Sequence, residues 1–107
     1  MKVYSPNKWK FRKNRKRKNK DTPYHPSIIV GEKDNKYANI GLTHNAKRGH
    51  HKNIPLHENP NKKDKRKSYL RTDLRFDDKE YLKEKLYGYK LSTKDIDKIY
   101  SIINKKR

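Results

Sequence analysis

The segment from Lys8 to Lys20 limits most strongly what this chain can fold into. It reads KWKFRKNRKRKNK and holds nine Lys or Arg, two aromatic residues and no acid. Like charges in the segment repel one another, and its apolar content is too low to offset the entropy that folding removes. We therefore predict a disordered or extended basic arm over residues 1–21, followed by a folded domain over residues 22–107.

Nucleic acid is the polyanion that suits this arm best, because each neutralised phosphate releases condensed counterions. Trp9 and Phe11 would add flat faces that stack on unpaired bases. Two alternatives stay open: a merely solvated tail, and attraction to an anionic membrane surface. The residues expected to bind nucleic acid lie in the arm and in a second basic cluster: Lys8, Trp9, Lys10, Phe11, Arg12, Lys13, Arg15, Lys16, Arg17, Lys18, Lys47, His50, His51 and Lys52.

The excess of positive charge extends along the whole chain. Thirty-one basic residues against twelve acidic ones leave a formal charge of +19, of which residues 1–20 contribute +10. A field of this sign speeds encounter with phosphate polymers and makes it sensitive to salt. We expect RNA rather than DNA as the partner, another protein as a further partner, and no membrane partner.

Composition also restricts the class of protein. Apolar residues make up 29% of the chain, which allows only a small core. The absence of cysteine excludes disulfide bonds and thiolate metal sites. The longest aliphatic run is three residues, so we expect neither a membrane-spanning helix nor a signal peptide. These features predict a cytoplasmic protein without a cofactor or a metal site.

Strand patterns dominate the chain after the arm. The segment Ser27–Lys33 is a short apolar run, Lys36–Thr43 alternates, and the turn residues Asp34 and Asn35 separate them. This order predicts a β-hairpin. Further along, the sequence predicts strands at residues 53–57 and 68–76, a hydrophilic loop at 59–67 and a short helix at 77–86.

The C-terminal segment carries the clearest helix pattern. Apolar residues from Ile96 to Ile103 recur with the i, i+3, i+4, i+7 spacing of an amphipathic helix. Ser92 is a favourable N-cap, with Asp95 three residues later. We therefore predict a helix over residues 92–105, and a mainly β fold of the α+β class that ends in this helix.

With the elements in this order, residues 22–105 resemble the PemK/MazF-type toxin family. The segment 24–30, YHPSIIV, looks like the family's R-P-(apolar)-V strand, and 40–44, IGLTH, looks like its (apolar)-P-(apolar)-T-S strand end. Residues 68–103 resemble its final strands and helix, with DLR at 73–75 and LSTKDI at 91–96. The resemblance implies a small SH3-like barrel with a C-terminal helix, and an endoribonuclease of a toxin–antitoxin pair.

The resemblance also implies where an active site would lie. The family's usual pair is an arginine before the first proline-marked strand and a threonine or serine at the end of the later strand. Thr43 occupies the second position, whereas His25 replaces the arginine.

The residue types themselves suit RNA cleavage without a metal. The 2′-hydroxyl is the internal nucleophile, so a base, an acid and a cation at the phosphate are needed. Histidine titrates near neutral pH and suits the first two roles. The candidate catalytic residues are therefore His25 or His44 as acid or base, Thr43 as a phosphate donor and Arg48 as a charge stabiliser, with His50 and His51 as secondary candidates.

Each of these residues also has a simpler explanation. Thr43 is an ordinary strand former, the histidines are common polar loop residues, and Arg48 is one more phosphate-binding cation. Three functions therefore remain open: a non-catalytic RNA-binding module of a ribonucleoprotein or mobile-element system, a toxin-type endoribonuclease acting on single-stranded RNA, and a protein that binds an acidic protein surface.

Overall fold

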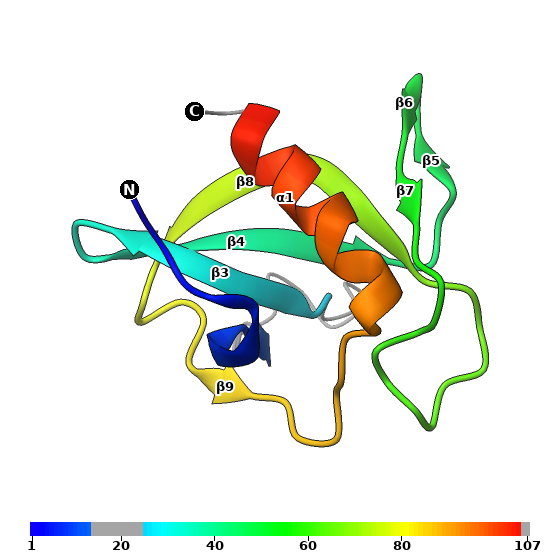
Figure 1. Cartoon of the computed structure of the whole chain (residues 1–107), viewed down its shortest axis with the longest axis horizontal. Helices are drawn as coiled ribbons and strands as arrows, with labels where there is room; N and C mark the ends of the chain where they lie inside the picture. The colour runs from blue at the N-terminus through cyan, green and yellow to red at the C-terminus, as the bar shows by residue number, and fades with distance from the viewer. Residues whose placement is uncertain (14–24, 106–107) are drawn as a thin grey trace.

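Most strands of this protein belong to one antiparallel sheet, and the C-terminal helix lies across one face of it (Figure 1). The structure is a computed structural model that describes residues 1–13 and 25–105. Its α+β class agrees with the prediction from sequence. In chain order the elements are β1 (Lys2–Val3), η1 (Pro6–Lys8), β2 (Lys10–Lys13), β3 (Ser27–Lys33), β4 (Lys36–Thr43), β5 (Lys47–Arg48), β6 (His51–Lys52), β7 (Ile54–Pro55), β8 (Tyr69–Asp78), β9 (Glu84–Lys85), η2 (Thr93–Asp95) and α1 (Ile96–Lys105).

The sheet has seven strands in the order β7-β8-β4-β3-β2-β9, and β1 pairs with β3 beside β2. Within the described residues, no pairing joins the end strands β7 and β9, so the sheet is open. In the described part of the chain, strands β5 and β6 pair with each other and with no further strand. They form a small hairpin that stands beside the main sheet (Figure 1).

The central hairpin β3–β4 confirms the prediction made from its alternation. Ile28 lies opposite Ile40, and both are completely buried. The connection between Lys33 and Lys36 is tight, with Asp34 at a positive φ of 56°. Aspartate tolerates this left-handed conformation better than most residues, because its short side chain bonds locally.

Two register shifts bend the strands around this hairpin. Val30 is an extra residue in β3, because Ile29 pairs with Asn39 and Gly31 pairs with Ala38. The second shift is larger: three residues of β8, 71–73, oppose the single residue Gly41 of β4. Bulges of this kind re-aim side chains and are frequent beside functional sites.

Residues 1–13 correct the prediction of a basic arm. Trp9 and Phe11 are only 7% and 6% exposed and belong to the core. The Trp9 ring lies 5.4 Å from that of Tyr100 in α1, and the indole Nε1 donates to the Tyr4 carbonyl at 2.9 Å. Burial of two large aromatic rings offsets the repulsion among neighbouring charges. Residues 1–13 of the predicted arm therefore belong to the folded domain. The rest of the predicted arm lies outside the described residues.

The C-terminal helix follows the prediction closely. Its apolar stripe buries Ile99, Ile102 and Ile103, and the helix packs against β8. The Ser92 hydroxyl accepts a hydrogen bond from the Lys94 N–H, and one 3₁₀ turn precedes the α-helix proper. In the described part of the chain, neither this helix nor the 3₁₀ turns are long and apolar enough to cross a membrane.

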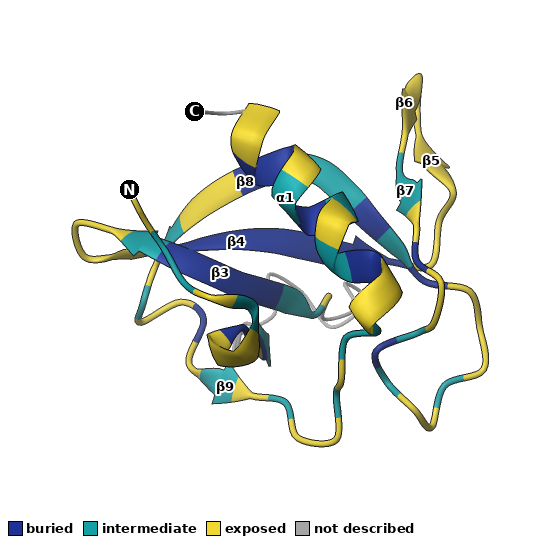
Figure 2. Ribbon diagram, viewed as in Figure 1, coloured by how far each residue is buried: buried dark blue, intermediate teal, exposed yellow. Residues whose placement is uncertain are grey.

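The short helix predicted over residues 77–86 is wrong. Strand β8 continues to Asp78, because it keeps pairing with β4 as far as Lys36, and a turn then leads to β9. Of the apolar residues in this segment, Leu82 is buried, Leu86 is partly buried and Tyr81 is exposed. Figure 2 shows the resulting core as a continuous buried layer along β3, β4 and the inner side of α1.

Candidate functional site

A pocket of about 250 Å³ opens where β3 begins and β4 ends. Three of the four candidate catalytic residues line it together. The loop between β7 and β8 supplies the opposite wall, and Tyr89 enters from the segment after β9. The full lining is His25, Pro26, Leu42, Thr43, His44, Asn59, Asn61, Asp64, Arg66, Ser68 and Tyr89.

The register of the central hairpin brings His25 to this pocket. Ser27 pairs with Gly41, and the Leu42 N–H donates to the Pro26 carbonyl at 2.9 Å. The ladder thus continues one step beyond β3 and places His25 beside the end of β4. Thr43 is 5% exposed, and its Oγ1 accepts from the Asn45 N–H at 3.2 Å. The hairpin therefore brings His25 to the end of β4, where two other candidates from sequence, Thr43 and His44, line the same pocket.

The pKa of His25 is lowered from the ordinary value of 6.5. Desolvation by burial is the main cause, and the positive charges of Arg71 and His44 add to it. The residue as a whole remains exposed at the mouth of the pocket, so the desolvation concerns the part of the ring that faces the protein. At neutral pH this imidazole is therefore uncharged and able to accept a proton.

Both ring nitrogens of His44 face oxygen acceptors. Nδ1 lies 3.2 Å from the Lys67 carbonyl, and Nε2 lies 3.4 Å from Oδ2 of Asp64. A protonated ring can donate to both oxygens. The ring is exposed at the pocket rim, and the contact with Asp64 is long. The His44 ring therefore contacts both solvent and the pocket.

Asp64 carries the negative charge of the β7–β8 loop where it lines the pocket. The Arg66 guanidinium donates to it through Nε at 3.1 Å and Nη2 at 2.9 Å, and the Arg66 backbone N–H adds a third bond at 3.0 Å. These bonds lower the pKa of Asp64 to about 2, so the carboxylate stays ionised beside His44. The same pair raises the pKa of Arg66.

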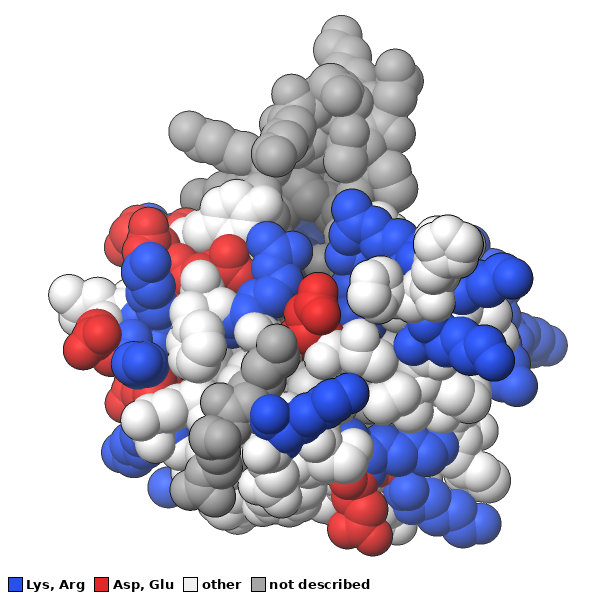
Figure 3. Space-filling view, turned by 90° about the horizontal axis from the view of Figure 1, so that it is seen from above, with Lys and Arg blue, Asp and Glu red and all other residues white. Residues whose placement is uncertain are grey.

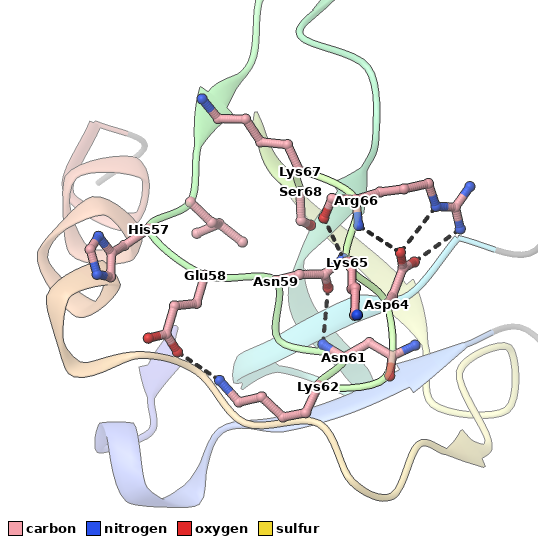
Figure 4. Close-up of a pocket in the computed structure, with 11 residues that line it drawn as sticks. His57, Glu58, Asn59, Asn61, Lys62, Asp64, Lys65, Arg66, Lys67 and Ser68 are labelled. Carbon is pink, nitrogen blue, oxygen red and sulfur yellow. Dashed lines mark hydrogen bonds and ion pairs between the residues drawn. The ribbon is translucent and has the colours of Figure 1, made fainter.

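Local hydrogen bonds fix the shape of this loop (Figure 4). The Asn59 amide donates to the Arg66 carbonyl at 2.9 Å, and its oxygen accepts from the Asn61 N–H at 3.0 Å. A second cavity, of about 440 Å³, adjoins the first, and the two share Asn59, Asn61, Asp64, Arg66 and Ser68. Asx-type turns of this kind hold a loop without any apolar periodicity.

Tyr89 and Ser68 complete the inner wall. Burial raises the pKa of Tyr89, so its hydroxyl remains protonated and can donate to an anion. The ring packs 5.4 Å from that of Phe11, which fixes its position. Sequence reasoning missed Tyr89, Asp64 and Arg66. Asp64 and Arg66 lie within the segment that was predicted from sequence only as a hydrophilic loop. An acid and an arginine two residues apart were the one feature of the sequence that could have indicated their pairing.

Arg48 does not line this pocket. With His50 and His51 it lines a neighbouring cavity of about 340 Å³, closed on the other side by Arg71, Thr72 and Asp73 of the β8 bulge. Lys47 and Lys52 lie on the same hairpin and are exposed. The second basic cluster predicted from sequence is thus a single structural unit beside the pocket.

The structure changes the roles expected for the arm residues that were predicted to bind nucleic acid. Trp9 and Phe11 cannot stack on bases, because their rings fill the core. The Arg12 guanidinium lies 5.1 Å from the centre of the Tyr37 ring and donates to the Leu82 carbonyl at 3.4 Å, so it has an internal role. Lys8 and Lys10 are exposed, and Lys13 is partly exposed on β2. Arg15, Lys16, Arg17 and Lys18 lie outside the described residues.

Charge is distributed unevenly over the surface. On the face seen in Figure 3, most acidic side chains gather at the end of the molecule that carries the β3–β4 turn. Lys and Arg dominate the opposite end, where the β5–β6 hairpin stands. Among residues 1–13 and 25–105, no three His, Cys, Asp or Glu side chains are grouped to hold a metal ion.

Comparison with protein-family models, with curated proteins and with solved structures finds no match.

Proposed function

We propose that this chain is a basic RNA-binding protein of the cytoplasm, acting within a ribonucleoprotein or mobile-element system. The observation that carries the proposal is the charge of the chain, +19 in total, together with its distribution on the face seen in Figure 3, where Lys and Arg dominate the end that carries the β5–β6 hairpin. Phosphate binding releases counterions at such a surface. Single strands are the preferred form, because their bases are accessible whereas the A-form major groove is closed to side chains.

Binding is tested by fluorescence anisotropy with a labelled 12-mer of oligouridylate between 50 and about 200 mM KCl. Affinity that falls steeply and linearly on a log–log plot is expected. Absence of binding at the lowest salt would contradict the proposal.

A second candidate function is metal-independent cleavage of single-stranded RNA, and the shared pocket of His25, Thr43 and His44 favours it. The neutral His25 imidazole takes the proton of the 2′-hydroxyl, and O2′ attacks the adjacent phosphorus. The P–O5′ bond breaks, and His44 gives its proton to O5′. Hydroxyls of Thr43 and Tyr89 donate to the phosphate oxygens as charge builds up. A 2′,3′-cyclic phosphate and a 5′-hydroxyl are the products.

This second candidate also supports a distant relationship to the PemK/MazF-type toxins. We propose that the bent sheet and the C-terminal helix represent a divergent SH3-like barrel, in which His25 replaces the usual arginine and His44 adds an acid. An antitoxin that covers the pocket would then be the protein partner.

Cleavage is tested on labelled RNA in the presence of EDTA. The wild type is compared with His25→Ala, His44→Ala and Thr43→Val, and each histidine variant is expected to lose about 100-fold or more in rate. Equal cleavage by all four proteins, or by none, would refute catalysis by this pocket and leave RNA binding to be judged by anisotropy.

A further inference from the structure

The β5–β6 hairpin and Arg71 bring several Lys and Arg side chains close together. Among the described residues, no acid fully neutralises this cluster. Across the hairpin, Lys47 pairs with Lys52 and Arg48 pairs with His51. Like charges directly opposite one another, such as those of Lys47 and Lys52, destabilise a strand pair. All four side chains are exposed, so no burial offsets this cost (Figure 2).

Arg71 faces this hairpin from the main sheet. It belongs to the bulge of β8, and its side chain crosses Gly41, where an added Cβ would lie 3.1 Å from the Arg71 Cδ. The missing side chain at Gly41 thus leaves the space in which the arginine stem lies. Burial lowers the pKa of Arg71, and the charges of Arg48 and Arg75 lower it further. The negative charge of Asp73 acts in the opposite direction and raises this pKa.

The two guanidiniums of Arg48 and Arg71 line one cavity of about 340 Å³. Gly49 and Asn53 also line it, so a backbone can approach closely at the hairpin turn. Arg71 is in addition near enough to His25 for its charge to act there. Arg71 therefore stands between this cavity and the pocket of His25 and His44.

We propose that Arg48 and Arg71 form a phosphate-binding subsite that holds the backbone of single-stranded RNA beside the His25 pocket. The substrate then spans at least two successive phosphates, one between the arginines and one at the histidines. Arginine suits this role because its planar guanidinium binds phosphate oxygens in pairs. The inference rests on the proposed function, since it assigns RNA to the same surface.

The test compares two probes, the labelled 12-mer of oligouridylate and the dinucleotide UpU, which has a single phosphate. Arg48→Gln and Arg71→Gln are each expected to weaken binding of the 12-mer about fivefold and to reduce its salt slope by about 0.7. The double variant should lose less than the product of the two effects, because both residues bind one phosphate. Binding of UpU, measured by competition, should change less than twofold.

Lys36→Gln is the matched control, because it removes one positive charge from an exposed residue at the far end of β4. Arg48 is exposed on the hairpin, so Arg48→Gln remains decisive even where Arg71→Gln fails to fold. Arginine variants that bind the 12-mer like Lys36→Gln would overturn the subsite, provided that the wild type binds. A wild type that binds no RNA would overturn the proposed function itself. Equal effects on a 12-mer of oligothymidylate would overturn the assignment to RNA.

Discussion

Asp95 joins the start of the C-terminal helix to the loop that walls the pocket. Its carboxylate is fully buried, accepts from the His57 N–H at 2.8 Å and pairs with Lys98 at 2.9 Å. A buried carboxylate bound to a backbone N–H and a cation holds both segments in place, because removing it leaves those donors unpaired. The shape of the pocket therefore depends on a residue outside it.

Replacing this carboxylate should destabilise the fold. We expect Asp95→Ala to lower the free energy of unfolding by about 2–3 kcal/mol, because a buried N–H and a cation then lose their partner. Urea unfolding followed by circular dichroism measures the change. Asp97→Ala, at an exposed acid in the first turn of α1, is the control and should cost less than about 1 kcal/mol. Equal losses in the two variants would contradict the structural role of Asp95.

The lowered pKa of His25 makes a separate prediction about pH. Burial disfavours the charged ring, so His25 should titrate below 6.5 in NMR spectra of the ring nitrogens. Arg71→Gln removes one repelling charge and should raise this pKa, while burial still holds it below the ordinary value. A base must be uncharged, so the cleavage rate should fall on acidification only near this lowered pKa. An unchanged pKa in Arg71→Gln would show that the two side chains do not interact.

Individual site residues were predictable to different degrees. His25 and Thr43 follow from strand register, because pairing across a hairpin is set by its turn and its alternation. Asp64 and Arg66 could not be placed in the same way. Their position depends on side-chain hydrogen bonds within a loop, and no periodicity signals such bonds.

Among the elements, the hairpin β3–β4 and helix α1 were predictable because their apolar residues recur with the periods of a strand and a helix. Strand β2 was not. Its sequence, KFRK, reads as a charge run, and only pairing with β3 and burial of Phe11 make it a strand. The bulge of β8 likewise depends on its partner, because a shift in register arises only between paired strands.

The pairing of β1 with β3 can be tested at Gly31. An added Cβ would collide with the Lys2 carbonyl oxygen, and backbone cannot move aside as a side chain can. We expect Gly31→Ala to detach β1, cost about 1–3 kcal/mol and shift the fluorescence of Trp9 to longer wavelength as its ring becomes hydrated. In the control Gly41→Ala, the nearest atoms belong to the flexible Arg71 side chain, so the emission should not move. Identical emission in both variants would contradict the pairing.

At the scale of the whole molecule, the N-terminal region combines two properties that the sequence alone could not separate. Residues 1–13 supply core side chains, whereas residues 14–20 supply five positive charges and no acid. Deleting residues 1–20 would therefore remove part of the core as well as the charge, and a loss of RNA affinity would have two explanations. Substitution within 14–20 changes the charge and leaves the described core intact.

Neutralising four of those cations should weaken RNA binding through electrostatics. We expect the quadruple Gln variant of Arg15, Lys16, Arg17 and Lys18 to reduce the salt slope for the 12-mer by up to about 3, because each lost phosphate contact contributes about 0.7 for a single strand. The matched control replaces four exposed lysines elsewhere by Gln, at Lys83, Lys90, Lys94 and Lys105, and loses the same net charge. If both variants reduce the slope equally, net charge alone governs binding. A larger reduction in the first variant assigns direct phosphate contacts to residues 15–18.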